Sequence, residues 1–86
     1  MPLQKLLSKY IQSTEQAFSE LKFAADSVVV DRKKAKDVID EARRYLEDAK
    51  YYRDNDQLET GIVSVVYGEG LLDALRLLGV VDFQWN

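Results

Sequence analysis

The sequence predicts an all-α fold, an antiparallel up-down-up bundle of three helices with a short aromatic C-terminal tail. Apolar residues recur in steps of three and four along three separate stretches, as they do on one face of a helix. The chain has one proline and four glycines among 86 residues, which is too few for the many turns of an all-β domain. A chain of this length is expected to form a single domain, residues 1–86.

The first helix is expected over residues 3–25, because its apolar and small residues fall on one face. The stretch from Asp26 to Asp31 then interrupts the pattern with three consecutive valines, whose side chains resist a helix at χ1. We expect a short connection here, with the valines tucked beneath it and Asp26 or Asp31 as the N-cap of the next helix. The apolar face of the first helix comprises Leu3, Leu7, Tyr10, Thr14, Ala17, Phe18, Leu21 and Ala25.

The second and third helices are expected over residues 32–53 and 58–78. Residues 54–57 supply turn chemistry between them, and either Asn55 or Asp56 is expected to cap the third helix. Gly79 stands where a glycine commonly ends a helix. The third helix is apolar on more than one side, which indicates that it is central in the domain or shared with a partner.

Small residues predict a close contact between these two helices. Ala42 and Ala49 lie a heptad apart on the second helix, and Gly61 and Gly68 lie a heptad apart on the third. A turn centred near residues 55–56 sets Ala49 opposite Gly61–Ile62 and Ala42 opposite Gly68–Glu69. Such pairs allow two helix backbones to approach more closely than the usual 8–10 Å.

The composition excludes several kinds of chemistry. The chain contains no cysteine and no histidine, which excludes disulfides and Ser–His or Cys–His nucleophilic catalysis. We therefore expect no catalytic residues, no cofactor and no zinc site. The net charge of −3 argues against a general nucleic-acid binder, and no apolar run approaches the roughly 20 residues of a membrane span. We expect a cytoplasmic protein.

Two charged groups are candidate sites. Glu69, Asp73 and Arg76 follow one line down the third helix, on a stripe that should face the core. They can form an ion pair at a solvated edge, completed by Tyr45 or a basic residue of the second helix, or they can bind a partner, a ligand or Mg²⁺. The second group is a cluster at the start of the second helix that could contact an anion or an RNA backbone, or could be a solvated face: Arg32, Lys33, Lys34 and Lys36.

The hairpin from Ala42 to Tyr52 and the run YGEGLLDALRLLG from Tyr67 to Gly79 resemble the archaeal domain of unknown function 357 family. Glu69 stands where many members have histidine, Gly68 replaces alanine, and Arg76 comes one position early. The resemblance implies a three-helix bundle and an archaeal source, and it implies no settled function. The matching positions are Ala42, Tyr45, Asp48, Ala49, Tyr51 or Tyr52, Tyr67, Gly70, Leu72, Asp73, Ala74 and Gly79.

These features favour a non-enzymatic module that binds a protein partner or a second copy of itself, most simply as a homodimer. An alternative is a nucleotide- or RNA-associated accessory domain that uses the Arg32–Lys36 patch, which would require basic residues of the first two helices to form one continuous surface. The expected interface is the second apolar sector of the third helix with the tail, unless the tail folds back over that sector within one chain. Its residues are Leu71, Leu75, Leu78, Phe83 and Trp85.

Overall fold

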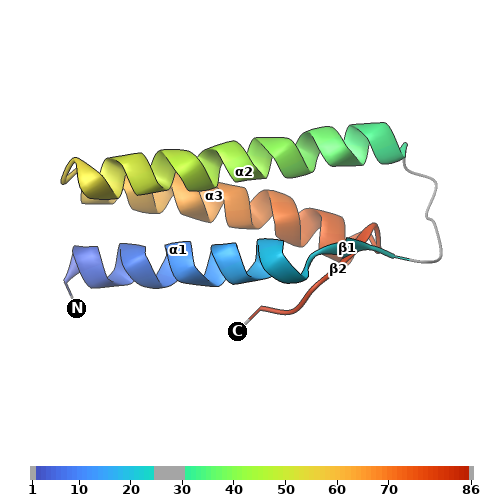
Figure 1. Ribbon diagram of the computed structural model, residues 1–86, viewed down its shortest axis with the longest axis horizontal. Helices are drawn as coiled ribbons and strands as arrows, with labels where there is room; N and C mark the ends of the chain where they lie inside the picture. Colours follow the sequence, from blue (N-terminus) through green and yellow to red (C-terminus); the bar gives the residue numbers. More distant parts are fainter. Residues whose placement is uncertain (1, 25–30, 86) are drawn as a thin grey trace.

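The computed structural model describes residues 2–24 and 31–85, in which three helices run in alternating directions (Figure 1). Helix α1 spans Leu3–Glu20, α2 spans Arg32–Asp54 and α3 spans Leu58–Leu77. Two short strands, β1 at Lys22–Phe23 and β2 at Val81–Asp82, pair in antiparallel fashion. The predicted three-helix bundle is confirmed. Within the described residues, none of the helices is long and apolar enough to span a membrane.

Helix α1 is shorter than predicted. It ends at Glu20 instead of near residue 25, and Leu21 already has an extended backbone with ψ 131°. The next residues form β1, which pairs with β2 in the register Lys22 to Asp82 and Phe23 to Val81. Helical periodicity continues through this segment, but pairing with a distant strand overrides it. Residues 25–30, including Asp26 and the predicted valine plug, lie outside the described part of the chain.

The N-cap prediction was right for α2 and wrong for α3. Asp31 is the N-cap of α2, and its carboxylate accepts a hydrogen bond of 2.9 Å from the backbone N–H of Lys33. Neither Asn55 nor Asp56 caps α3, because its N-cap is Gln57, which makes no side-chain capping bond. Asn55 and Asp56 instead terminate α2.

Asp56 adopts the left-handed conformation, with φ 59°, that ends α2. The backbone N–H of Gln57 donates to the carbonyl of Tyr52 at 2.8 Å, and that of Asp56 donates to Arg53 at 3.2 Å. These are the two bonds of a Schellman motif. Aspartate tolerates the left-handed region better than most residues, and the chain can therefore turn sharply into α3.

Gly79 ends α3 in the same way, as predicted. Its φ is 77°, and the backbone N–H of Val80 donates to the carbonyl of Leu75 at 2.9 Å. The chain then reverses into β2, whose neighbour Phe83 is buried. This turn brings the aromatic tail back onto the bundle (Figure 1).

Helices α2 and α3 form the most extensive contact in the fold, and the Ala/Gly seam (Ala42, Ala49, Gly61 and Gly68) lies within it. Both alanines have no exposed surface. A Cβ atom built on Gly68 would lie 3.1 Å from the carbonyl oxygen of Ala42, which confirms the predicted pairing of these two positions. The hydroxyl of Ser64 donates a hydrogen bond of 2.7 Å to the carbonyl of Tyr45 and ties the two helices together.

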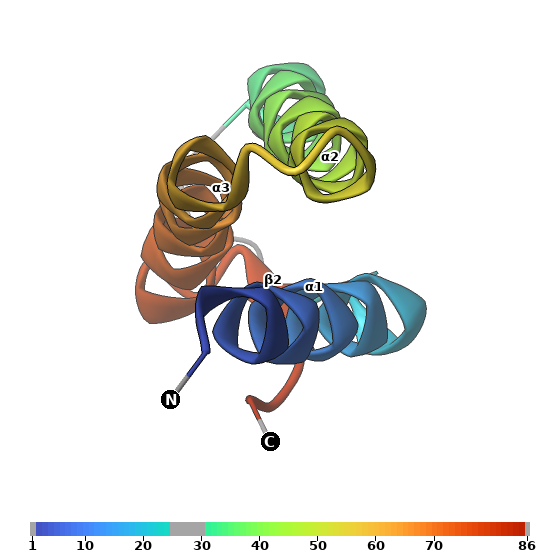
Figure 2. The same ribbon diagram turned by 90° about the vertical axis from the view of Figure 1, so that its left-hand side faces the viewer.

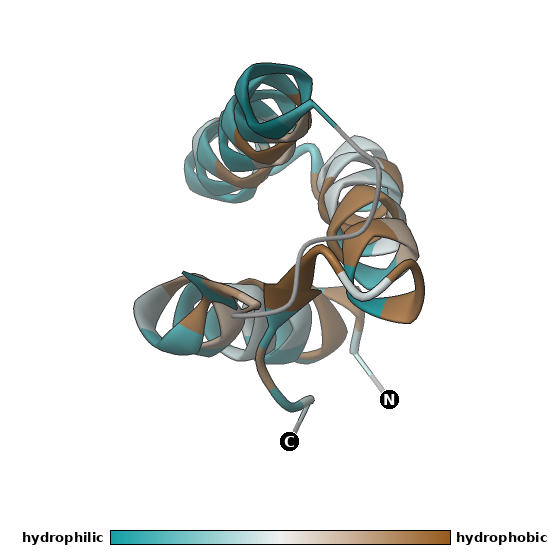
Figure 3. Cartoon of the chain, turned by 90° about the vertical axis from the view of Figure 1, so that its right-hand side faces the viewer, coloured by the Kyte–Doolittle hydropathy of each residue, from teal (hydrophilic) through white to brown (hydrophobic). Residues whose placement is uncertain are grey.

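Helix α1 lies at an incline across the α2–α3 pair (Figure 2). It packs through larger side chains, because Leu7 and Ile11 are buried against Leu46 and Val65. Figure 3 shows the contrast between the other two helices: α2 is hydrophilic over most of its surface, whereas α3 is pale or hydrophobic around its circumference. Helix α3 is thus central to the fold and still apolar where neither neighbour covers it.

Polar contacts supplement the apolar packing between α1 and α2. The ammonium of Lys50 lies 2.7 Å from a carboxylate oxygen of Glu15 on α1 and 2.9 Å from one of Glu47. Hydrogen bonds, first to Glu15 and then to Glu47, raise the pKa of Lys50. The guanidinium of Arg43 also lies 4.4 Å from the ring centre of Phe18, a cation–π contact between the same two helices.

The first prediction tests the seam with two alanine substitutions on α3. Gly68→Ala should lower the free energy of unfolding by about 1–3 kcal/mol, since the new methyl group overpacks against the backbone of Ala42. Gly70→Ala is the matched control, because a Cβ atom there meets nothing within 4 Å. It should raise the free energy of unfolding by up to about 1 kcal/mol through helix propensity. Urea denaturation of dilute protein measures both, and equal effects would contradict the close approach.

Candidate functional site

The structure brings two of the three aligned charges on α3 together. One carboxylate oxygen of Asp73 accepts hydrogen bonds from Nε and Nη2 of Arg76, at 3.0 and 2.8 Å. It also accepts one of 2.9 Å from the indole Nε1 of Trp85 in the tail. The site is therefore the ion pair at a solvated edge that was one of the sequence-based interpretations, here completed by an indole.

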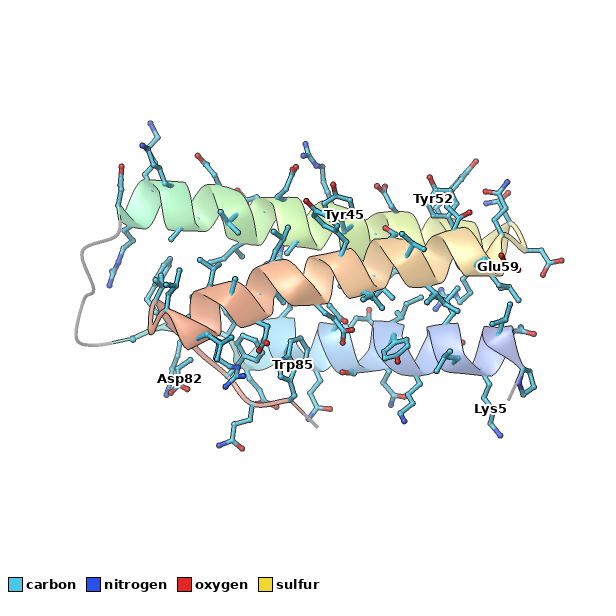
Figure 4. All side chains as sticks on the ribbon, turned by 180° about the vertical axis from the view of Figure 1, so that it is seen from behind. Lys5, Tyr45, Tyr52, Glu59, Asp82 and Trp85 are labelled. Atoms are coloured by element: carbon cyan, nitrogen blue, oxygen red, sulfur yellow. The ribbon has the colours of Figure 1, made fainter. Side chains whose placement is uncertain are left out.

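The prediction that Tyr45 completes this ion pair was wrong. The ring of Tyr45 stacks on Tyr67, with ring centres 4.7 Å apart, on the side of α3 that faces α2. Trp85 takes the place beside Asp73 instead (Figure 4). The available sequence signal was that a buried indole N–H requires an acceptor, but its partner depended on the path of the tail.

The electrostatics of Asp73 follow from these contacts. Hydrogen bonds from Trp85 and then from Arg76 hold the pKa of Asp73 below its ordinary value. All the donors point to one oxygen of a carboxylate that already has a cationic partner. The arrangement fixes the tail on α3 and keeps the aspartate ionised, so it serves as a structural clamp.

Glu69 lies apart from this clamp, against α1. Burial raises the pKa of Glu69, the nearby hydroxyl of Thr14 lowers it by less, and the negative charge of Asp73 adds to the rise. Thr14 is fully buried and donates its hydroxyl hydrogen to the carbonyl of Tyr10 at 2.8 Å. A half-buried carboxyl with no cationic partner among the described residues is costly when ionised.

The second prediction concerns the tail clamp. Trp85→Phe removes the indole donor, so the pKa of Asp73 should rise toward its ordinary value. A lowered pKa stabilises the fold at pH values above the ordinary pKa of the group, and that stabilisation is lost as the pH falls through the folded-state pKa. The variant should therefore lose stability at neutral pH and less of it in acid. A carboxyl NMR titration follows Asp73 directly, with Gln84→Ala as the tail control; an unchanged titration in Trp85→Phe would contradict the clamp.

The third prediction concerns Glu69, whose pKa is shifted in the opposite direction. The protonated form is favoured by folding, so its stabilising effect is present at low pH and is lost as the pH rises through the folded-state pKa. Glu69→Gln imitates that form and should raise the free energy of unfolding at pH 7, with the gain vanishing in acid. Denaturation at several pH values measures this. Glu59→Gln, an exposed change on the same helix, should stay within about 0.5 kcal/mol, and a pH-independent gain for Glu69→Gln would contradict the argument.

The basic cluster occupies the first turn of α2, where Arg32, Lys33, Lys34 and Lys36 are all exposed. The guanidinium of Arg32 lies 4.6 Å from the ring centre of Phe23 on β1. The lysines of α1 do not extend this patch, because Lys5 marks the opposite end of the bundle (Figure 4) and Lys9 lies one turn further along α1. Lys5 and Lys9 therefore do not join the cluster, whereas the exposed Lys22 of β1 directly precedes Phe23, the residue whose ring Arg32 contacts.

The expected interface of α3 and the tail changes in the structure. Leu75 and Phe83 are 5% exposed and belong to the chain's own core, and Leu71 and Trp85 pack against that core. The strand pair folds the tail back over this sector, so Leu75 and Phe83 present little surface to another molecule. Only Leu78 is widely exposed, at 57%. The predicted interface is wrong at Leu75 and Phe83, which the chain itself buries, and it stays a prediction at Leu71, Leu78 and Trp85. The intramolecular alternative describes the tail.

A different face of α3 is open. We define the α3 outer face as the exposed apolar and small residues along one side of α3, with Tyr67 at the edge nearest α2. It includes four of the large exposed apolar side chains of the described residues, with Val63 and Leu77 the most exposed at 69% and 73%. Leu78 flanks it. The α3 outer face consists of Val63, Val66, Tyr67, Gly70, Ala74 and Leu77.

Two hollows lie near the candidate residues. The hollow beside the strand pair has a volume of about 640 Å³ and is lined by Lys22, Phe23 and the tail. A shallower one of about 360 Å³ is lined by Glu69 and Asp73 together with Trp85. Within residues 2–24 and 31–85, no three acidic side chains gather as they would to hold a metal ion.

Fold and surface together define a small helical bundle that presents an apolar helix face and a structural ion pair. The chain belongs to the family described as protein of unknown function (DUF357), whose model matches residues 9–81. This match confirms the family that the residues of the α2–α3 hairpin indicated. No curated protein and no solved structure matches the chain significantly.

Proposed function

We propose that this protein is a non-enzymatic protein-interaction module and that it binds its partner through the α3 outer face. The observation that carries the proposal is the exposure of this face. Val63, Tyr67 and Leu77 keep 69%, 56% and 73% of their surface uncovered. Contiguous apolar surface on this scale is a common mark of a protein-binding site.

The remaining chemistry fits a binding role better than catalysis. The charges of Asp73 and Arg76 are directed at each other and at Trp85, so they are engaged inside the fold. Glu69 shares a shallow hollow with Asp73, but the Asp73 carboxylate is already engaged by Arg76 and Trp85. Catalysis by general acid and base requires such groups to converge on one substrate position.

The alternative of an RNA-associated accessory domain ranks second. Its supporting observation is the exposure of Lys33, Lys34 and Lys36 at one end of α2. Phosphate backbones are bound through several cations spread along a surface. This cluster covers little more than one turn of α2, and Lys5 lies at the far end of the bundle (Figure 4).

The fourth prediction tests the interaction module. Tagged wild-type protein, the double variant Val63→Glu/Leu77→Glu and the control Tyr51→Glu are each used to capture proteins from the native cell extract. Tyr51 is a matched control because it is 62% exposed on α2, outside the α3 outer face. A specific partner should be retained by the wild type and by Tyr51→Glu, and reduced about tenfold or more in the double variant. Each carboxylate would have to be desolvated in the apolar contact.

Circular dichroism and thermal melting verify that all three proteins are folded, which is expected because the substituted side chains are exposed. Quantitative mass spectrometry then compares the captured proteins. Identical capture by the wild type and the double variant would show that the α3 outer face is not the binding surface.

A further inference from the structure

The α3 outer face has the spacing of a helix that packs against another helix. Val63, Tyr67, Gly70, Ala74 and Leu77 follow one another in steps of four, three, four and three. This is the heptad rhythm that keeps one side of a helix in contact with a neighbouring helix. Every one of these positions is exposed, although one edge of the face, at Tyr67, also contacts the ring of Tyr45 on α2.

The exposed area reaches the lower limit of a specific dimer interface. The large side chains of the face, with Leu78 beside them, expose on the order of 500 Å² per chain, because side chains of this size present roughly 150–250 Å² each when uncovered. Two such faces in contact would bury about 1,000 Å², which is where specific interfaces begin.

No contact within the chain explains why residue 70, at the centre of this face, is a glycine. A Cβ atom there would meet nothing within 4 Å, whereas Gly68 is required by the backbone of Ala42. A glycine in the interior of a helix costs about 1 kcal/mol relative to alanine. A helix approaching from outside the chain would give Gly70 the role that Gly68 has inside it, a point of close backbone approach.

We propose that the partner bound by the α3 outer face is a second copy of this chain, with the two α3 helices antiparallel about a two-fold axis at Gly70. This inference rests on the proposed function. An interface on a two-fold axis must be complementary to itself, and this one is. Positions equally far from Gly70 meet, so Val63 faces Leu77 of the second copy, and Val66 faces the small Ala74.

The charges beside the face are compatible with this pairing. Asp73 and Arg76 neutralise each other at 2.8 Å within each chain, and Glu69, which has no cationic partner among the described residues, lies toward Thr14 of α1. A lipid surface fits less well, because helices that lie on membranes carry lysine and arginine along the border of their apolar face. The border of this face carries Glu69 and Asp73.

The fifth prediction is a concentration-dependent dimer, measured by sedimentation equilibrium on the purified full chain. Val63→Glu and Leu77→Glu should each weaken dimerisation at least tenfold, because a carboxylate would be desolvated at each end of the contact. Tyr51→Glu should dimerise like the wild type. A wild-type chain that stays monomeric at high micromolar concentration would overturn the proposal, and so would a dimer that both glutamate variants leave intact.

Cysteine cross-linking tests the orientation, since the chain has no cysteine of its own. Gly70→Cys should form an intermolecular disulfide on mild oxidation, because the two residues meet at the axis. Val63→Cys is the control and should not, because its two copies would lie about 21 Å apart along the helices. Efficient cross-linking of Val63→Cys, or none of Gly70→Cys, would overturn the antiparallel arrangement.

The same measurements separate this inference from the proposed function. A purified chain that stays monomeric, yet captures a different protein through the α3 outer face, would retain the interaction module and reject the second copy. A monomeric chain whose captured proteins are unaffected by Val63→Glu/Leu77→Glu would reject both.

Discussion

The close approach of α2 and α3 is the constraint on which the rest of this structure depends. Ala42 and Gly68 allow the two backbones to meet, and the Ser64 hydroxyl joins them through the carbonyl of Tyr45. Side chains this small bury little apolar area at the contact itself. The hydrophobic stabilisation must therefore come from elsewhere, and it comes from α1 on one side and the returning tail on the other.

The chain accordingly has two clusters of buried apolar residues, one toward each end of the α2–α3 hairpin. Leu7 and Ile11 of α1 supply bulk near one end of the hairpin, while Phe83 of the tail supplies it near the other, where α1 has already given way to β1. The clamp between Asp73 and Trp85 holds the tail in that place. An 86-residue chain has a small core, so covering the C-terminal end of α3 with its own tail contributes a substantial part of the buried surface.

This packing leaves one side of α3 uncovered. A helix that is apolar around its circumference can bury two sides within a three-helix bundle, and its third side remains in solvent. That third side is the α3 outer face, centred on a glycine that no contact inside the chain requires. The nearby charges of Asp73 and Arg76 already contact each other within the fold. A partner would therefore be recognised by the shape and the apolar area of this face.

The sequence by itself predicted the three helices, the contact of Ala42 with residues 68–69 and the helix end at Gly79, and it narrowed the cap of α2 to Asp26 or Asp31, because these features follow from local periodicity and backbone preference. It also placed Asp73 and Arg76 one turn apart, close enough to pair. Only the tertiary structure decided that α1 stops early to form β1, since its partner strand lies far along the chain. Which side of α3 stays exposed was likewise decided only by the tertiary structure. Because α3 is apolar on every side, its sequence pattern does not indicate which side is buried, and this depends on where α1, α2 and the tail pack against it.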